Sequence, residues 1–342
     1  MGASRLGTPG GYSAGILFLL ASPALSELGA QDAPPRLTAA ADEGGGAVLL
    51  ADGGRPILTY QARRVELPAG YLEQVAEGNR IYAEPRSGYL HPLYGLDGEE
   101  LTLDWSVDHP HHRGIYWAWP EVQLGERTGD LHALQAVYSR PVGEPALTGA
   151  GESARVEAQN LWLWQDETPV VFERVAITAG ALGADGSRAI DLELRFEALA
   201  DGVSLARRGT DLYGGLNLRL APVEGLKFGH YAQEATLASK PRAWSTATGI
   251  WKGGRRVTTL AILEHPTNPD FPGDFITYED LPWFQPAFPR AGTRYSLERG
   301  QPLTLRYRFL IQPGDAVPDV LAAACDRYAA TAPLFPRNEL ER

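Results

Sequence analysis

Apolar and polar residues alternate along much of the chain, which is the pattern of antiparallel strands with one buried face. The stretch from Ala189 to Leu199 alternates apolar and charged residues over its length. Comparable apolar runs occupy residues 47–50, 56–60, 161–164, 169–177, 216–220, 258–263 and 303–311. Asp52-Gly53-Gly54, between the first two runs, is a hairpin turn signal. The pattern therefore predicts many antiparallel strands.

One helix is predicted near the C-terminus, from about Val317 to Ala330. Val320, Leu321, Ala324 and Tyr328 recur there at helical spacing, after a turn at Gly314-Asp315. The strands come first and the helix last, without the strand–helix alternation of a parallel α/β sheet. The fold class that we expect is all-β: a large antiparallel, supersandwich-like β-sandwich with a short C-terminal helix.

The N-terminus has the features of an export signal. Arg5 is the only charged residue before Glu27, and the apolar run 14–21 is too short for a membrane span. Small residues at 24 and 26, or at 29 and 30, are suitable for cleavage. We predict a signal peptide over residues 1–30, a linker over 31–45 and a single domain over 46–335. The predicted location is periplasmic or extracellular, and the chain is not expected to be an integral membrane protein.

The composition and the absent motifs limit which binding partners and which enzyme classes are compatible with the sequence. The net charge of −11 argues against a nucleic-acid or anionic-membrane partner and is compatible with neutral small molecules. Cys325 is the only cysteine, so no intramolecular disulfide can form, and its alanine-rich surroundings predict a buried structural thiol. The sequence lacks a P-loop, a Gly-x-Ser-x-Gly elbow, a His-Glu-x-x-His motif and a multi-cysteine metal site, which disfavours the corresponding enzyme classes.

The densest group of titratable residues is Asp108-His109-Pro110-His111-His112-Arg113-Gly114, which holds three of the seven histidines. If the segment is extended, His109 and His111 share one face, although Pro110 can distort this arrangement. These two histidines could then form half of a divalent-metal site. Alternatively, one histidine acts as a general acid or base beside a carboxylate, or the group is a polar cluster that stabilises a loop.

Other candidates lie at a distance in the sequence. His91 precedes a turn that contains Asp97, which can also serve as a simple turn cap. His265 and Asn268 lie in a loop that follows a predicted strand, a common place for functional residues. Asp130 and His132 give a weaker signal, and we expect them in a solvated loop.

Aromatic residues accompany these clusters. Sugar rings stack on aromatic faces, while their hydroxyls bind polar side chains. Trp283 and Phe284, in a segment bounded by prolines, are predicted to be exposed platforms. The alternative prediction for Tyr116, Trp117 and Trp119 is that they fill the core of the sandwich.

Several of these motifs together resemble the PmoA-like family, labelled "methane oxygenase PmoA". The similarity spans roughly residues 45–330. The motifs that carry it are residues 89–95 together with 97–99, and residues 108–114, 213–216, 265–269 and 305–309. The resemblance implies an exported all-β protein used in carbohydrate breakdown. A membrane oxygenase subunit would need several spanning helices, which this chain lacks after its leader.

We therefore expect a carbohydrate-active enzyme, a hydrolase, lyase or epimerase, that uses acid–base chemistry on a neutral sugar-like substrate. The candidate catalytic residues are His109, His111, Asp108, His91 and His265. The candidate substrate-binding residues are Arg113, His112, Asp97, Trp283 and Asn268. Two alternatives stay open: a metal-dependent oxygenase or hydrolase with His109 and His111 as ligands, and a non-catalytic glycan-binding protein. The sequence requires no cofactor and does not predict an oligomeric state.

Overall fold

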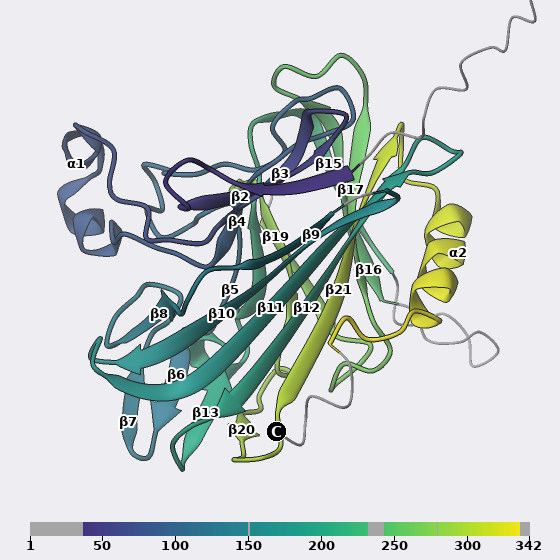
Figure 1. Ribbon diagram of the computed structural model, residues 1–342. Helices are drawn as coiled ribbons and strands as arrows, with labels where there is room; N and C mark the ends of the chain where they lie inside the picture. The colour runs from purple at the N-terminus through teal and green to yellow at the C-terminus, as the bar shows by residue number, and fades with distance from the viewer. Residues whose placement is uncertain (1–36, 150, 232–242, 279, 336–342) are drawn as a thin grey trace, which may run out of the picture. The chain divides into compact units, whose positions relative to one another are not determined.

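The computed structural model describes residues 37–149, 151–231, 243–278 and 280–335, all within one compact unit (Figure 1). The predicted signal peptide, residues 1–30, lies outside these ranges. Among the helices in the described ranges, none has the length and apolar character that a membrane span requires.

The strands of the described residues form three antiparallel sheets of eight, nine and four strands. The first sheet has the order β1 (Leu37–Ala41), β2 (Ala47–Asp52), β3 (Arg55–Gln61), β4 (Tyr89–Leu93), β5 (Ile115–Ala118), β14 (Gly215–Arg219), β19 (Trp283–Ala287) and β18 (Asp274–Tyr278). The second has the order β15 (Val223–His230), β16 (Trp244–Trp251), β17 (Thr258–Glu264), β21 (Leu303–Pro313), β12 (Arg188–Ala198), β11 (Thr168–Leu182), β10 (Ser153–Trp164) and β8 (Val137–Pro141), with β9 (Ala146–Gly149) also paired to β10. The small sheet has the order β20 (Tyr295–Leu297), β13 (Val203–Ala206), β6 (Glu121–Leu124) and β7 (Arg127–Gly129). The helical segments are α1 (Tyr71–Gln74), the 3₁₀ turns η1 (Glu77–Tyr82) and η2 (Arg208–Thr210), and α2 (Pro318–Ala329).

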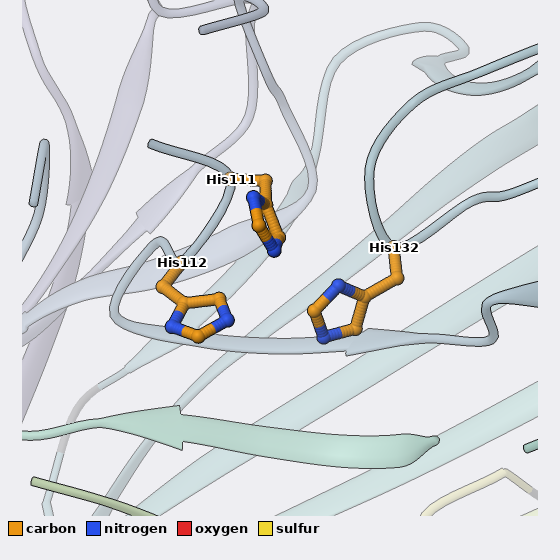
Figure 2. A group of neighbouring side chains, drawn as sticks. All are labelled: His111, His112 and His132. Atoms are coloured by element: carbon orange, nitrogen blue, oxygen red, sulfur yellow. The ribbon is translucent and has the colours of Figure 1, made fainter. Parts of the chain in front are cut away.

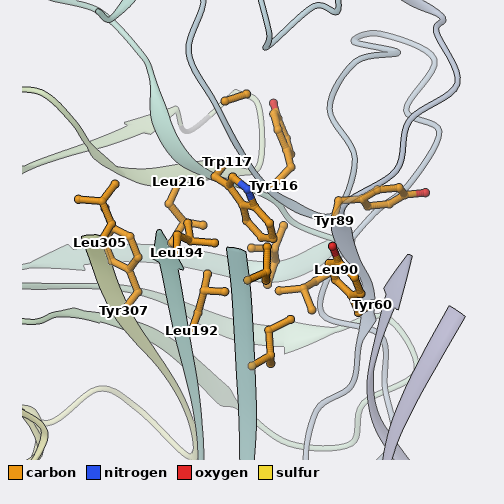
Figure 3. Packing of buried hydrophobic residues seen from close by; sticks show 14 of the residues in the cluster. Tyr60, Tyr89, Leu90, Tyr116, Trp117, Leu192, Leu194, Leu216, Leu305 and Tyr307 are labelled. Atoms are coloured by element: carbon orange, nitrogen blue, oxygen red, sulfur yellow. The ribbon is translucent and has the colours of Figure 1, made fainter. Parts of the chain in front are cut away.

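The main core lies between the two large sheets (Figure 3). Trp117 and Leu216 from the first sheet belong to the same buried cluster as Leu192 and Leu194 of β12 and Tyr307 of β21. Full burial of an aliphatic or aromatic side chain of this size stabilises the fold by about 1.5–3 kcal/mol. The predicted antiparallel β-sandwich is confirmed, and each stretch assigned to a strand from its alternation lies largely within an observed strand.

The predicted C-terminal helix is α2, and it packs on the outer face of the second sheet. Leu321, Ala324, Cys325 and Tyr328 form its buried stripe, at the i, i+3, i+4, i+7 spacing of an amphipathic helix. This stripe contacts a small apolar cluster of the sheet that includes Trp244. Cys325 is buried, as predicted.

One predicted boundary needs correction. Residues 37–41 were assigned to the linker 31–45, but they form β1, which pairs with β2 along its whole length. Leu37 is fully buried. Leu-Thr-Ala-Ala-Ala has a single polar residue and therefore shows no alternation, so its strand structure depends on the partner strand and is not visible in the segment itself.

The face of the first sheet that points away from the core carries polar and aromatic side chains. Tyr116 and Trp117 are neighbours on β5, so they point to opposite faces, and Trp117 points into the core (Figure 3). Tyr116 lies opposite Asn217 on β14, and Arg219, two residues further along β14, lies opposite Trp283 on β19. Residues opposite each other share a face. The candidate site lies on this outward face.

Candidate functional site

A cleft of about 430 Å³ adjoins the outward face of the first sheet, and Trp283 of that face belongs to its lining. Its walls come from the loop that precedes β5, the loop that follows β7, the turns η1 and η2, and the ends of β18 and β19. The lining residues are Asn79, Tyr82, Asp108, His109, His111, His112, His132, Ala133, Arg208, Tyr213, Tyr278, Leu281 and Trp283.

Arg113 and Gly114 hold the loop that precedes β5. Arg113 is fully buried, pairs with Asp104 (Nη2 to Oδ2, 3.1 Å), and places its guanidinium 3.4 Å from the centroid of the Trp105 ring. Gly114 has a φ of +54°, and a Cβ at this position would lie 2.2 Å from the carbonyl oxygen of Leu90, so only glycine fits. The structure thus places Arg113 beneath the loop and not in the cleft, where we expected it to bind substrate.

The histidine loop is a tight turn and not an extended segment. The backbone N–H of His112 donates to the carbonyl oxygen of His109 at 2.9 Å. As a result, the rings of His109 and His112 stack with centroids 4.7 Å apart, whereas His109 and His111 meet edge-on at 6.0 Å. The extended pairing of His109 with His111 was wrong, because the turn at Pro110 breaks the two-residue alternation on which that prediction depended.

His111, His112 and His132 converge instead. One potential ligand atom of each lies within 4.8 Å of the other two, and Figure 2 shows ring nitrogens of the three side chains facing a common space. The Tyr116 hydroxyl lies 2.9 Å from Nε2 of His132. This contact leaves Nδ1 of His132 as the nitrogen available to the other two rings. Among the described residues, these three histidines are the group whose donor atoms are arranged for a metal ion.

Burial keeps these three imidazoles neutral. It lowers the pKa of His111 to about 3, with a further contribution from the nearby Arg86 guanidinium. Burial, followed by the proximity of His111, lowers the pKa values of His112 and His132 well below the ordinary value for histidine. A neutral imidazole has a lone pair on one nitrogen, so at pH 7 each ring can accept a hydrogen bond or bind a metal.

His109 and Asp108 form a pair at the wall of the cleft. Nδ1 of His109 lies 3.2 Å from Oδ2 of Asp108, and the His109 side chain is 43% exposed. Asp108 also accepts a hydrogen bond from the Ser106 hydroxyl. Arg219 Nη2 donates to both carboxylate oxygens of Asp108, at 3.0 Å from Oδ1 and 2.9 Å from Oδ2. Partial burial alone would raise the pKa of Asp108, but the Ser106 hydrogen bond and the Arg219 charge outweigh it and hold the pKa well below its usual range. A permanently ionised carboxylate therefore orients a solvent-accessible imidazole.

Trp283 reaches the cleft, but from a strand and not from an exposed loop. It is 2% exposed, and its ring stacks on His112 with centroids 5.3 Å apart and on Tyr278 with centroids 4.9 Å apart. Phe284, which we expected to be a second platform, points into the core. The partly exposed rings of the cleft are Tyr82, Tyr213 and Tyr278.

Comparison with known proteins identifies the family. A model of a family of unknown function, DUF6807, matches residues 47–326. This chain belongs to the DUF6807 family. The resemblance to the PmoA-like family was wrong, because DUF6807 is the family that matches and no PmoA family does. A search of curated proteins found no match.

Two predicted site residues of this DUF6807 member, His91 and Asp97, do not line the cleft. His91, on β4, lies next to Gly114 beneath the loop, and its Nδ1 is 3.0 Å from the Thr102 hydroxyl. Burial lowers its pKa. Asp97 pairs with Arg256 at 3.0 Å and lines a separate hollow of about 290 Å³.

The second predicted cluster, His265 and Asn268, does not converge on the cleft. His265 follows β17 and packs its ring 5.0 Å from that of Tyr328 on α2. Arg306 Nη1 lies 2.8 Å from Nε2 of His265. Asn268 accepts a hydrogen bond from the backbone N–H of Arg306 at 2.8 Å and donates to its carbonyl oxygen at 3.0 Å. Both residues therefore connect the loop to β21.

His132 was expected in a solvated loop, but it is one of the three convergent histidines of the cleft. His132 is 1% exposed. Its loop is fixed by Arg86, which donates to the carbonyl oxygens of Leu131 and His132 at 2.8 and 2.6 Å, and by Asp130, which accepts from the backbone N–H of Ala133 at 2.8 Å. Asp130 followed by His132 was a visible signal, but nothing in the sequence relates this segment to Arg86, more than 40 residues earlier.

A second hollow, of about 550 Å³, adjoins the first. Tyr82, Arg208 and Tyr213 belong to the linings of both. Arg208 pairs with Asp130 through its Nη2, so the junction carries a salt bridge and two phenol rings. The cleft therefore continues past these three side chains toward the loop that contains Asp130.

Proposed function

We propose that this DUF6807 member is a carbohydrate-active enzyme that performs acid–base chemistry on a neutral, sugar-like substrate. The observation that carries the proposal is the His109–Asp108 pair at the wall of an aromatic cleft. Hydrolysis, elimination and epimerisation of sugars all need a positioned group that accepts or donates a proton. His109 is assigned that role, and Asp108 is the positioning residue.

The lining of the cleft supports a neutral, polar ligand with apolar ring faces. Tyr82, Tyr213 and Tyr278 offer ring faces for stacking. Its charged groups are balanced, because Arg208 is paired with Asp130 and Asp108 with Arg219. The volume of about 430 Å³ lies in the range of small-molecule sites, roughly 300–1,000 Å³.

The export predicted from residues 1–30 belongs to the same proposal, because an exported enzyme meets sugars outside the cytoplasm. Arg5 and the apolar run 14–21 are the residues that support it.

The proposal is tested with purified protein and a panel of neutral mono- and oligosaccharides. A substrate raises the melting temperature, because it binds the folded state, and yields a product detectable by mass spectrometry. In His109→Gln the turnover number falls by about 10²–10⁴-fold, the usual contribution of a general acid or base. The matched control is His230→Gln, an exposed histidine that does not line the cleft, which keeps wild-type turnover.

Two results contradict the proposal. Stabilisation by a sugar with no product from any member of the panel identifies a glycan-binding protein. Unchanged turnover in His109→Gln removes the acid–base role from this residue.

A further inference from the structure

We infer that His111, His112 and His132 bind a divalent transition-metal ion, such as Zn²⁺, whose remaining coordination position opens into the cleft. The inference deepens the proposed function and rests on it in one respect: the ion serves the same ligand cleft. Its geometric basis, the convergence of three imidazoles from two loops, is independent of any sugar.

The donor set fits such an ion. Imidazole nitrogen is a preferred ligand of Zn²⁺, Cu²⁺, Ni²⁺ and Fe²⁺. The three donor atoms lie within 4.8 Å of one another, whereas ligands of a tetrahedral zinc with bonds of 2.0–2.1 Å are separated by roughly 3.3 Å. Rotations that move the ring nitrogens by about 1 Å would close this difference, a small displacement for side chains that border a cleft.

Tyr116 prepares His132 for this role. Its hydroxyl lies 2.9 Å from Nε2. When Nε2–H donates to this oxygen, the lone pair is on Nδ1, which faces His111 and His112 (Figure 2). Outer partners that fix the tautomer of a histidine ligand in this way are a general feature of metal sites.

All three histidines line the cleft, so the group borders open space. Within the described residues the group consists of three histidines, the number that catalytic zinc sites use together with a water or substrate molecule. His109, the ligand predicted from the sequence, stacks on His112 outside the group. The guanidinium groups whose charges act on these histidines are already engaged, Arg86 by backbone carbonyls, Arg208 by Asp130 and Arg219 by Asp108.

The experiment measures metal binding by the full chain in the absence of sugar. Protein stripped with a chelator is titrated with Co²⁺, monitored by its visible absorption, and then with Zn²⁺, with the content determined by elemental analysis. We expect about one equivalent of tightly bound Zn²⁺. His111→Gln and His132→Gln each weaken binding by at least about 100-fold, and Tyr116→Phe weakens it by about 10–100-fold, as removal of an outer-shell partner does.

His109→Gln is the matched control, because it changes a histidine of the same loop that lies outside the three-histidine group. This variant is expected to bind the same number of equivalents of Zn²⁺ as the wild type. Less than about 0.1 equivalent of Zn²⁺, Co²⁺, Ni²⁺ or Cu²⁺ in folded wild-type protein overturns the inference, because metal sites of this type bind tightly. Wild-type affinity in both His111→Gln and His132→Gln also overturns it. If either variant is unfolded by circular dichroism, X-ray absorption of the wild-type Co²⁺ complex decides, with three imidazole ligands expected.

An experiment that refutes the metal site can be distinguished from one that refutes the proposed function. A metal-free protein that still turns over a sugar refutes the metal site alone. A metal-loaded protein with no product from any sugar refutes the proposed function alone.

Discussion

Two loops of this chain contain a His-Pro pair and an acidic neighbour, yet they differ in how their imidazoles are bonded. In the loop after β17, both ring nitrogens of His265 have partners: Thr267 Oγ1 at 2.8 Å from Nδ1, and Arg306 at 2.8 Å from Nε2. In the loop before β5, Nδ1 of His111 and of His112 is buried without a hydrogen-bond partner among the described residues.

The difference distinguishes a histidine that is bonded within the fold from histidines with an unpartnered buried nitrogen. Buried polar atoms are normally hydrogen-bonded, and an exception calls for an explanation. His265 satisfies both nitrogens within the fold and connects two elements. His111 and His112 line the cleft, and in the proposed metal site an ion would complete their bonding. Residue type alone does not distinguish these cases, whereas the bonding of each nitrogen does.

The largest effects are expected at the buried arginine that anchors each loop. Arg113→Met and Arg306→Met each lower the free energy of unfolding by about 3–5 kcal/mol, because each leaves a buried acidic partner, Asp104 or Glu193, uncompensated. Urea denaturation measures this loss. The comparison predicts that folded Arg306→Met keeps the ligand affinity of the cleft, whereas Arg113→Met loses it. A loss below 1 kcal/mol in either variant contradicts the anchoring role.

A smaller effect is expected from pH at the second loop. Burial raises the pKa of Glu264, at the end of β17, from 4.5 to about 7. Between pH 4.5 and 7 the unfolded carboxyl ionises while the folded one stays protonated, so its contribution to stability is lost as the pH rises. Glu264→Gln stays neutral. The stability difference between wild type and variant therefore changes by an amount on the order of 3 kcal/mol across this interval. Denaturation at pH 4.5, 6 and 7.5 measures it, and a constant difference refutes the shift.

The smallest effect tests the comparison directly. His265→Leu removes an acceptor from the buried Arg306 and lowers the free energy of unfolding by about 1–3 kcal/mol. His111→Leu removes no protein hydrogen bond from Nδ1, so the expected change is below about 1 kcal/mol in either direction. Equal losses in the two variants, measured side by side by denaturation in metal-free buffer, would show that the two loops do not differ as described.

The fold was largely predictable from the sequence, and the site only in part. The alternation over 189–199 and similar runs predicts strands because side chains on a half-buried sheet repeat every two residues. The dense group at 108–114 marked the main loop of the site. His132 and Tyr116 were not predicted as partners of that loop, because strand pairing and loop contacts bring them together, and alternation does not encode which strands are neighbours.

Arg113 shows a different limit. Its position beside three histidines suggested a substrate contact, but its side chain is directed into the fold by Asp104 and by the ring of Trp105. Asp104 is nine residues away, and nothing in the spacing distinguishes a buried anchor from an exposed ligand group.

The opposite orientation of Tyr116 and Trp117 separates the two faces of the strand as targets for substitution. One residue contacts His132 on the outward face and the next fills the interior, so alternate positions of the same short strand meet two different physical requirements. Substitutions at every second residue of β5, β14 and β19 therefore change the outward face, while the intervening residues keep the sandwich core intact.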